Sequence, residues 1–214
     1  DGVAKLLNIS NNPDNFDEKD VQNYAENILK DTNANSSSQS LQINTQSLLR
    51  LMFGVHGISF DRSFQELEEI FIRAAEEISL VDQVQNLLDY LKSKNIRMAI
   101  LSNTGFSELT HRKQLEDLGV EDYFEFFVAT SDYCIKKPDR RIFDLSLAKL
   151  GLRSSEVWYI GNKYEYDIIG ANNAEIFPVW LNEEGKQVES KIEHLEVKSY
   201  FELMNILKKN WGGL

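Results

Sequence analysis

The feature that most constrains the fold is an alternation of helical and strand patterns that begins near Val81 and continues toward the C-terminus. Short apolar runs have the character of buried strands, and segments with apolar residues three and four positions apart separate them. The apolar runs are RMAILS, FEFFVAT, VWYIG and IFPVWL. Because helices that alternate with strands connect parallel strands, we predict an α/β fold over residues 81–214, with a parallel sheet and helices on both of its faces.

The first 80 residues have a different pattern, which is helical. Segments such as VQNYAENILK and FQELEEIFIRAAEEI carry apolar residues at helical spacing. The polar stretch DTNANSSSQS, residues 31–40, separates these segments and is predicted to be a loop. We therefore expect two parts, an all-helical part at 1–80 and an α/β part at 81–214.

Composition excludes several classes of function. The 34 acidic and 23 basic residues give a net charge of -11, which would repel nucleic acid unless a basic patch intervened. The short HRKQ segment at 111–114 is interpreted as a solvated helix face. No apolar run approaches the length of a membrane span, and the single cysteine fits a reducing compartment. We expect a cytoplasmic protein that binds neither nucleic acid nor a membrane.

Polar side chains lie at three predicted strand ends of the α/β part, where sites on parallel sheets are found. Ser102 and Asn103 follow the run AIL, Lys137 stands before Pro138 at a predicted helix start, and Asp167 lies in the first turn of the helix after VWYIG. Taken singly, the serine could cap a helix, the lysine could lie on the surface, and the aspartate could complement a helix dipole. Together, a hydroxyl, an ammonium and a carboxylate at one edge predict a site that binds an anion.

The order and spacing of these features resemble the haloacid dehalogenase-like hydrolase superfamily, whose members are mostly phosphatases. The segment ILSN resembles the second motif of that family, KKPDRRIF the third, and YIGNKYEYDIIGANNA the fourth. The resemblance extends from about Val81 to Leu181. It implies a Rossmann-like α/β core, together with a helical cap that residues 1–80 would supply.

The resemblance also implies a chemistry. Ser102 and Asn103 would bind phosphate, Lys137 would neutralise the transferred group, and Asp167 and Asn162 would hold Mg²⁺. The catalytic residues present in this chain would be the serine and the lysine. The substrate would be a small phosphorylated metabolite, and an aspartate nucleophile would form an aspartyl-phosphate intermediate.

One departure from the family pattern concerns the metal. The family usually has an acid where this chain has Asn162, and a neutral amide should weaken a Mg²⁺ site. Because the dehalogenases of the family work without a metal, a metal-independent haloacid dehalogenase is an alternative. A catalytically inactive member that binds phosphate or a partner is another.

A second departure is that no Asp-x-Asp occurs in the 214 residues. The first motif, with its nucleophile and its acid/base residue, is therefore absent, and the chain as given is expected to be inactive. A parallel sheet without that central strand would leave two rows of backbone groups unpaired. We expect a strand and loop of on the order of 10 to 20 residues before Asp1. No pattern in the sequence predicts the substrate or the oligomeric state.

Overall fold

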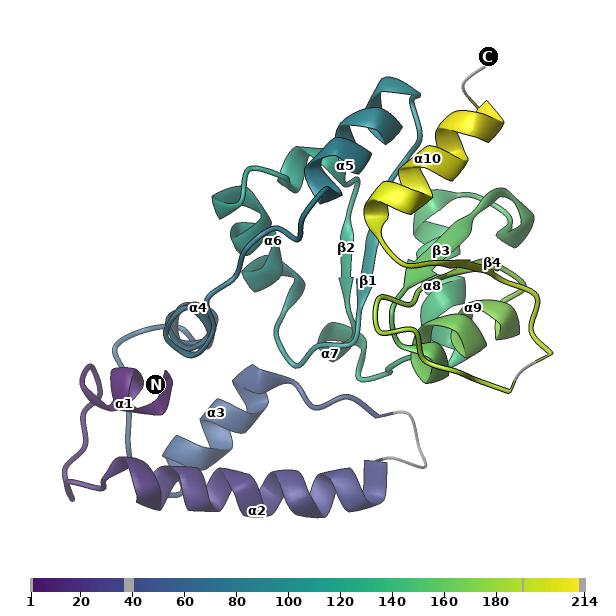
Figure 1. The fold of residues 1–214 in the computed structure, drawn as a ribbon. Helices are drawn as coiled ribbons and strands as arrows, with labels where there is room; N and C mark the ends of the chain where they lie inside the picture. The colour runs from purple at the N-terminus through teal and green to yellow at the C-terminus, as the bar shows by residue number, and fades with distance from the viewer. Residues whose placement is uncertain (1, 37–40, 190, 212–214) are drawn as a thin grey trace.

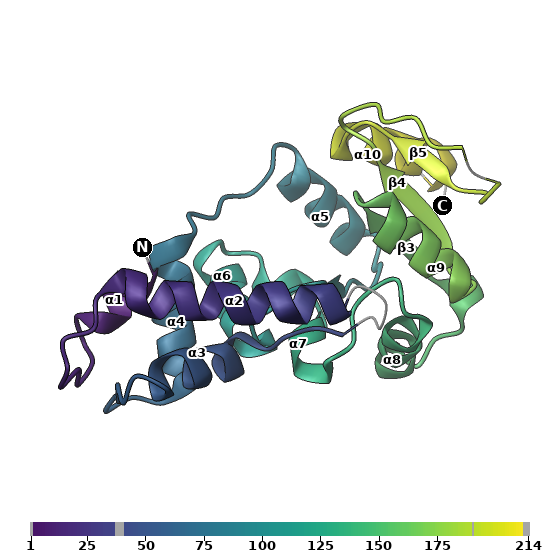
Figure 2. The same cartoon turned by 90° about the horizontal axis from the view of Figure 1, so that it is seen from below.

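A computed structural model describes residues 2–36, 41–189 and 191–211, which form a helical part and an α/β part (Figures 1 and 2). Every regular element that it describes before residue 80 is a helix. These helices are α1 (Gly2–Leu7), α2 (Glu18–Ser36), α3 (Thr45–Gly54) and α4 (Phe64–Ala75). They share one apolar core, whose innermost residues include Leu6, Leu49, Phe53 and Leu67.

Helix α2 is longer than the sequence pattern indicates. The polar composition predicts a loop at residues 31–40, but the helix continues to Ser36, so the prediction is wrong for the first six of these residues. Residues 37–40 lie outside the described ranges. Asn, Thr, Asp and Ser disfavour a helix by at most about 0.7 kcal/mol each. A helix that is already nucleated can continue through such residues, because each one added still gains a backbone hydrogen bond.

Within the described residues, the α/β part contains five strands in two parallel sheets. Strand β1 (Ile100–Ser102) pairs with β2 (Phe127–Ala129). The second sheet has the order β3 (Trp158–Gly161), β4 (Phe177–Leu181) and β5 (Leu195–Val197). The α/β fold class is confirmed, and β1 to β4 are the four predicted strands. The sequence analysis missed β5 because its segment, HLEVK, lacks the run of apolar residues that marks the other four strands.

Helices cover both faces of the second sheet, as predicted. Val179 and Leu181 of β4 pack against α5 and α10, whereas Trp180, which points to the other face, packs against Tyr164 and Ile168 of η3. The helical elements of this part are α5 (Val84–Ser93), α6 (Glu108–Asp117), η1 (Glu121–Tyr123), α7 (Thr130–Tyr133), α8 (Arg140–Leu150), η2 (Ser154–Glu156), η3 (Tyr164–Ile168), α9 (Ile169–Asn173) and α10 (Tyr200–Trp211). Over the described ranges, no helix combines the length and hydropathy of a membrane span.

The sheet is interrupted between β1 and β3. The sequence predicts one parallel sheet, but no backbone pairing joins these two strands in the part of the chain that the structure describes. Side chains bridge them instead: the Tyr159 hydroxyl lies 3.1 Å from the carbonyl oxygen of Leu101, and Lys137 Nζ lies 3.4 Å from the same oxygen. One edge of β1 and one edge of β3 therefore have no strand partner among the described residues.

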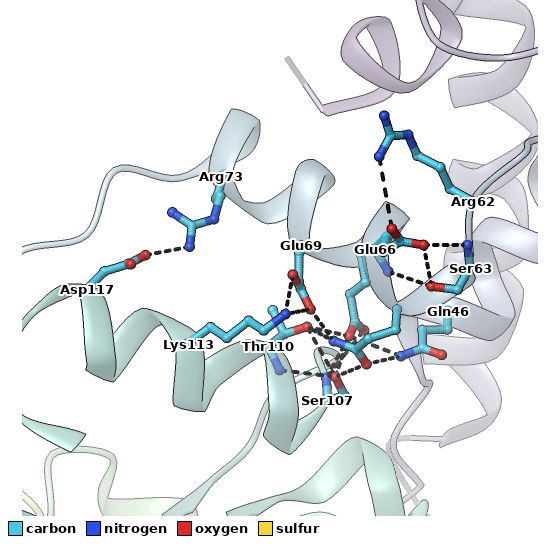
Figure 3. Close-up of polar contacts among 12 residues, drawn as sticks. Gln46, Arg62, Ser63, Glu66, Glu69, Arg73, Ser107, Thr110, Lys113 and Asp117 are labelled. Atoms are coloured by element: carbon cyan, nitrogen blue, oxygen red, sulfur yellow. Dashed lines mark hydrogen bonds and ion pairs between the residues drawn. The ribbon is translucent and has the colours of Figure 1, made fainter. Parts of the chain in front are cut away.

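Helices α4 and α6 join the two parts of the molecule (Figure 3). Lys113 Nζ donates to both carboxylate oxygens of Glu69 at 2.7 Å, and Arg73 forms an ion pair with Asp117 at 2.5 Å. Glu68, which is fully buried, lies between these helices and accepts hydrogen bonds from the first turn of α6. The joint is thus polar, and it fixes the position of the helical part against the α/β part.

The HRKQ segment lies in α6 and is not a solvated face. Gln114 is buried, Lys113 pairs with α4, and the half-buried ring of His111 stacks on Phe127 with 4.9 Å between the centroids. The prediction is wrong because α6 presents polar side chains to a polar partner. A periodicity analysis that expects apolar residues at buried positions does not detect such a contact.

Candidate active site

A pocket of about 300 Å³ lies between the open edges of β1 and β3. Its lining includes Ser102 at the end of β1, Asn162 after β3, and the side chains of Lys137 and Asp167 from two other segments. The fold therefore brings four of the five predicted site residues to one place. The fifth, Asn103, does not line the pocket.

Lys137 is almost completely buried, with 7% of its surface exposed. Its Nζ atom lies 2.6 Å from Asp167 Oδ1, 2.8 Å from the Tyr159 hydroxyl and 3.4 Å from the Leu101 carbonyl oxygen. An ammonium that leaves water needs an opposite charge and partners for its three hydrogens, and these contacts supply both. The ammonium is therefore held in one position at the wall of the pocket.

Both oxygens of Asp167 are engaged. Oδ1 accepts from Lys137, and Oδ2 accepts from the backbone N–H of Lys163 at 2.9 Å. The wide turn η3 and the glycine before it create this geometry, because a Cβ added to Gly161 would lie 2.3 Å from Asp167 Cγ. Only glycine at position 161 lets the carboxylate approach the end of β3 so closely.

Tyr159 is a site residue that the sequence analysis missed. Its hydroxyl contacts Lys137 Nζ, the Leu101 carbonyl oxygen and, at 3.3 Å, Asp167 Oδ1. Burial and the negative charge of Asp167 hold the pKa of the Tyr159 hydroxyl well above its usual value, so this group stays a neutral donor. Tyr159 lies in an apolar strand pattern, which predicts a core residue. Its position within that strand was the one signal in the sequence for a role in the site.

Asn103 connects two segments of the site. Its Oδ1 accepts from the backbone N–H of Lys137 at 2.8 Å, and its Nδ2 donates to the carbonyl oxygen of the same residue at 3.1 Å. The amide is occupied by these two bonds and holds the lysine segment against the end of β1. Ser102 differs, because it lines the pocket and its hydroxyl has no hydrogen-bond partner among the described residues.

The described residues do not build a Mg²⁺ site by themselves. Asp167 is committed to Lys137 and Lys163, and Asn162 offers one uncharged oxygen on an exposed side chain. Across the described ranges, no group of three or more His, Cys, Asp or Glu side chains has the arrangement of a metal site. Hard divalent cations require several oxygen ligands, most of them charged, and this set does not provide them.

Comparison with known proteins identifies the family. A profile described as haloacid dehalogenase-like hydrolase matches residues 3–181. The chain is 34% identical over 148 residues to the pyrimidine 5'-nucleotidase YjjG of Escherichia coli strain K12, which covers 68% of this chain and 64% of that protein. It is 29% identical over 146 residues to the (S)-2-haloacid dehalogenase 4A of Burkholderia cepacia, covering 67% of this chain and 62% of that protein.

A solved structure gives the same result for the fold. The 2-haloacid dehalogenase of Pseudomonas syringae pv. tomato superimposes with a TM-score of 0.67 at 21% identity, over 92% of this chain and 83% of that one. The two sequence matches each span a little under two thirds of the relative's length. The family match covers more than half of the chain, and the parallel α/β architecture agrees with it. The chain therefore belongs to the haloacid dehalogenase-like hydrolase family.

Proposed function

We propose that this hydrolase acts on a small phosphate monoester. The observation that carries the proposal is that the buried Lys137 and Ser102 line the same pocket. A fixed ammonium and a free hydroxyl are the donors that stabilise the oxygens of a phosphoryl group. The similarity to a pyrimidine 5'-nucleotidase supports the same class of substrate.

In this proposal, the weakest contact of Lys137 is the one that the substrate replaces. The ammonium uses its three hydrogens on Asp167, Tyr159 and Leu101, and the contact with the Leu101 carbonyl oxygen, at 3.4 Å, is the longest. That oxygen keeps the hydrogen bond from Tyr159 when Lys137 turns away. One hydrogen then becomes available to a phosphoryl oxygen while Asp167 holds the ammonium in place.

We further infer that an additional strand carries the nucleophile and lies between β1 and β3. Two open parallel edges border the pocket, and the Leu101 carbonyl oxygen accepts from side chains where a neighbouring strand would donate. An aspartate at the carboxyl end of such a strand would lie next to Ser102 and Lys137. The helical part, residues 1–80, would then act as a cap over the site, and α4 and α6 would hold it there.

The test uses the polypeptide translated from the complete gene, assayed for phosphate release from phenyl phosphate with added Mg²⁺ and with a chelator. We expect release in at least one condition, and we expect Lys137→Met to abolish it. The surface variant Lys19→Met is the matched control and should retain it. Release that requires Mg²⁺ would show that a metal site forms despite the neutral Asn162, and release in the chelator would show that no metal is needed. Absence of phosphate release in both conditions would contradict the proposal and favour an inactive, anion-binding protein.

A metal-independent haloacid dehalogenase is the second candidate. The neutral Asn162 and the closed Lys137–Asp167 pair favour it, as does the similarity to the Burkholderia enzyme. The same preparation would be incubated with (S)-2-chloropropionate in the presence of a chelator. Chloride release without phosphate release would favour this candidate over the phosphatase.

A further inference from the structure

The pocket between β1 and β3 has a second polar side, which the second sheet supplies. Asn162 follows β3, Glu183 follows β4 and Tyr200 follows β5, and all three line the pocket. Because these strands are parallel, their carboxyl ends meet at one edge of the sheet, where ligands of α/β proteins bind. Ser102 comes from β1, on the other side of the gap. A ligand at the Ser102 side therefore lies in the same pocket as Glu183.

The turn that carries Glu183 is held by a buried side chain. Asn182, with 2% of its surface exposed, accepts from the N–H of Lys186 at 2.8 Å and donates to the carbonyl oxygen of that residue at 2.9 Å. It also donates to Glu196 Oε1 at 2.8 Å. Gly185 closes the turn with a φ of +65°, a conformation that favours glycine. These contacts fix the backbone on either side of Glu183 and hold the residue at the pocket.

The two acids of this turn differ in their partners. Glu184 forms an ion pair with Lys186 at 2.9 Å, and the hydrogen bond and charge of that lysine lower the pKa of Glu184. Glu183 is exposed and lines the pocket, and its carboxylate has no ion pair or hydrogen bond within residues 2–36, 41–189 and 191–211. The negative charge of Glu183 is therefore not neutralised by a neighbouring side chain.

This charge changes the balance of the pocket. Its charged lining residues are one cation, Lys137, and two anions, Asp167 and Glu183. Lys137 is paired with Asp167 at 2.6 Å, so Glu183 leaves the lining with a net negative charge. That charge would repel a phosphate group that entered alone, whereas a ligand that also carries a cation would be attracted at both ends.

Tyr200 lies within electrostatic reach of the same carboxylate. Burial, and to a smaller extent the negative charge of Glu183, raise the pKa of the Tyr200 hydroxyl, so this group stays neutral. Tyr200 is half-buried, and its hydroxyl has no hydrogen-bond partner in the chain as described. A carboxylate together with a tyrosine suits an alkylammonium group, which gains an ion pair from the first and a cation–π contact from the second.

We propose that Glu183, beside Tyr200, selects phosphate monoesters whose alcohol carries an ammonium group. The inference rests on the proposed phosphatase function and adds the class of alcohol to it. The phosphate would lie at Ser102 and Lys137, and the ammonium would lie at Glu183. A short carbon chain can join them, because one pocket of about 300 Å³ is lined by all of these residues. The strand inferred between β1 and β3 would fill the gap between the strands, whereas Glu183 and Tyr200 lie beyond the strand ends.

The test compares two non-hydrolysable phosphonates of equal size, 3-aminopropylphosphonate and butylphosphonate, which differ by an ammonium in place of a methyl group. NMR titration of the polypeptide translated from the complete gene, in a chelator, gives the dissociation constant of each. We expect the amino compound to bind about fivefold more tightly, the upper range for one exposed ion pair. Added salt should reduce this preference, because Glu183 is exposed.

Two neighbouring variants assign the preference to one carboxylate. Glu183→Gln should remove the preference for the amino compound and slightly tighten butylphosphonate binding, since a repulsive charge is lost. Glu184→Gln is the matched control, because it removes a charge from the same turn that is already paired with Lys186, and it should keep the preference. Both side chains are exposed, and thermal unfolding of each variant confirms that it is folded.

The outcomes separate this inference from the proposed function. Equal affinity for the two phosphonates, or the same preference in Glu183→Gln and Glu184→Gln, would overturn the role of Glu183 and leave the phosphate site intact. Lys137→Met should weaken both compounds, and binding of both that is unchanged in this variant would contradict the phosphate site. If neither compound binds the original protein, the proposed function fails and this inference fails with it.

Discussion

Two buried carboxylates, Glu68 and Asp167, are stabilised in different ways. Glu68 has none of its surface exposed and accepts from Ser107 Oγ, Thr110 Oγ1, Gln46 Nε2 and a backbone N–H, which are all neutral donors. Asp167 has 3% exposed and is paired with an ammonium that is itself buried. The first carboxylate lies in the joint between α4 and α6, and the second lines the pocket at the open sheet edges.

The two arrangements suit the carboxylates to different roles. Several neutral donors that point at one carboxylate fix its position and the positions of the helices that carry them. Every hydrogen-bonding group of such a network is used, so none is left to bind a ligand. A buried ion pair adds little net stability, because desolvation offsets much of the attraction. Under the proposed function, its presence beside the pocket keeps the ammonium in position for an anion. Glu68 is therefore interpreted as structural and Asp167 as a positioning residue.

The largest expected effect comes from removing the ammonium. Lys137→Met leaves the Asp167 carboxylate buried without its counter-charge, and the free energy of unfolding should fall by about 3–5 kcal/mol. Urea unfolding monitored by circular dichroism measures it. The double variant Lys137→Met with Asp167→Leu removes both charges and should recover much of the loss. A single variant as stable as the original chain would mean that Asp167 is not buried as described.

Breaking the neutral network should have a smaller effect. In Glu68→Gln, an amide nitrogen that is itself a donor faces the hydroxyls of Ser107 and Thr110, so stability should fall by about 1–3 kcal/mol. The adjacent Glu69→Gln is the matched control, because its partly exposed pair with Lys113 contributes under about 1 kcal/mol. Glu68→Gln should leave phosphate affinity unchanged, unlike Lys137→Met. Equal losses of stability in Glu68→Gln and Glu69→Gln would show that the buried network of Glu68 contributes no more than the partly exposed ion pair of Glu69.

These two carboxylates also show what the sequence could predict. The position of Asp167 at the site was predictable from local sequence. A strand followed by a glycine and by a helix with an acid in its first turn is typical of a strand-end site. Glu68 was not, since it stands in the run ELEE with other acids, and its burial depends on α6, some forty residues away. Tyr159 was missed for a similar reason: a tyrosine in an apolar strand is expected in the core, and its hydroxyl contacts come from distant segments. Local patterns predict elements and strand-end residues, whereas polar contacts between distant elements require the structure.

The third prediction concerns the neutral donor inside the ionic site. Tyr159→Phe removes one hydroxyl that contacts Lys137 and the Leu101 carbonyl oxygen, and it should lower stability by about 1 kcal/mol. Phosphate affinity should also fall, because the ammonium is then held by fewer groups. Tyr166→Phe, at an exposed position, is the control and should change neither quantity. If both variants behaved alike, Lys137 and Asp167 would form the site without help from Tyr159.

The smallest expected effect lies between the two regions, at His111. Burial lowers the pKa of His111, although the charges of Glu68, Glu76 and Asp132 act in the opposite direction. The neutral ring fits its contacts, since Nε2 accepts from Thr104 Oγ1 at 2.7 Å and Nδ1 donates to Gln114 Oε1 at 2.9 Å. Thr104 follows Asn103, so the ring links the joint to the segment that carries Ser102.

The direction of the pH dependence follows from that lowered pKa. Below the unfolded-state pKa of about 6.5, the unfolded chain binds a proton that the folded chain resists, so stability decreases as the pH falls through this range. In His111→Gln this contribution is absent, and the free energy of unfolding should decline less steeply between about pH 7 and pH 5. Chemical unfolding across that interval compares the slopes, and an NMR titration of the ring gives the protonation midpoint. A midpoint at or above the value of a free histidine would show that burial does not outweigh the nearby carboxylates, and the expected loss of stability at low pH would then be absent or reversed.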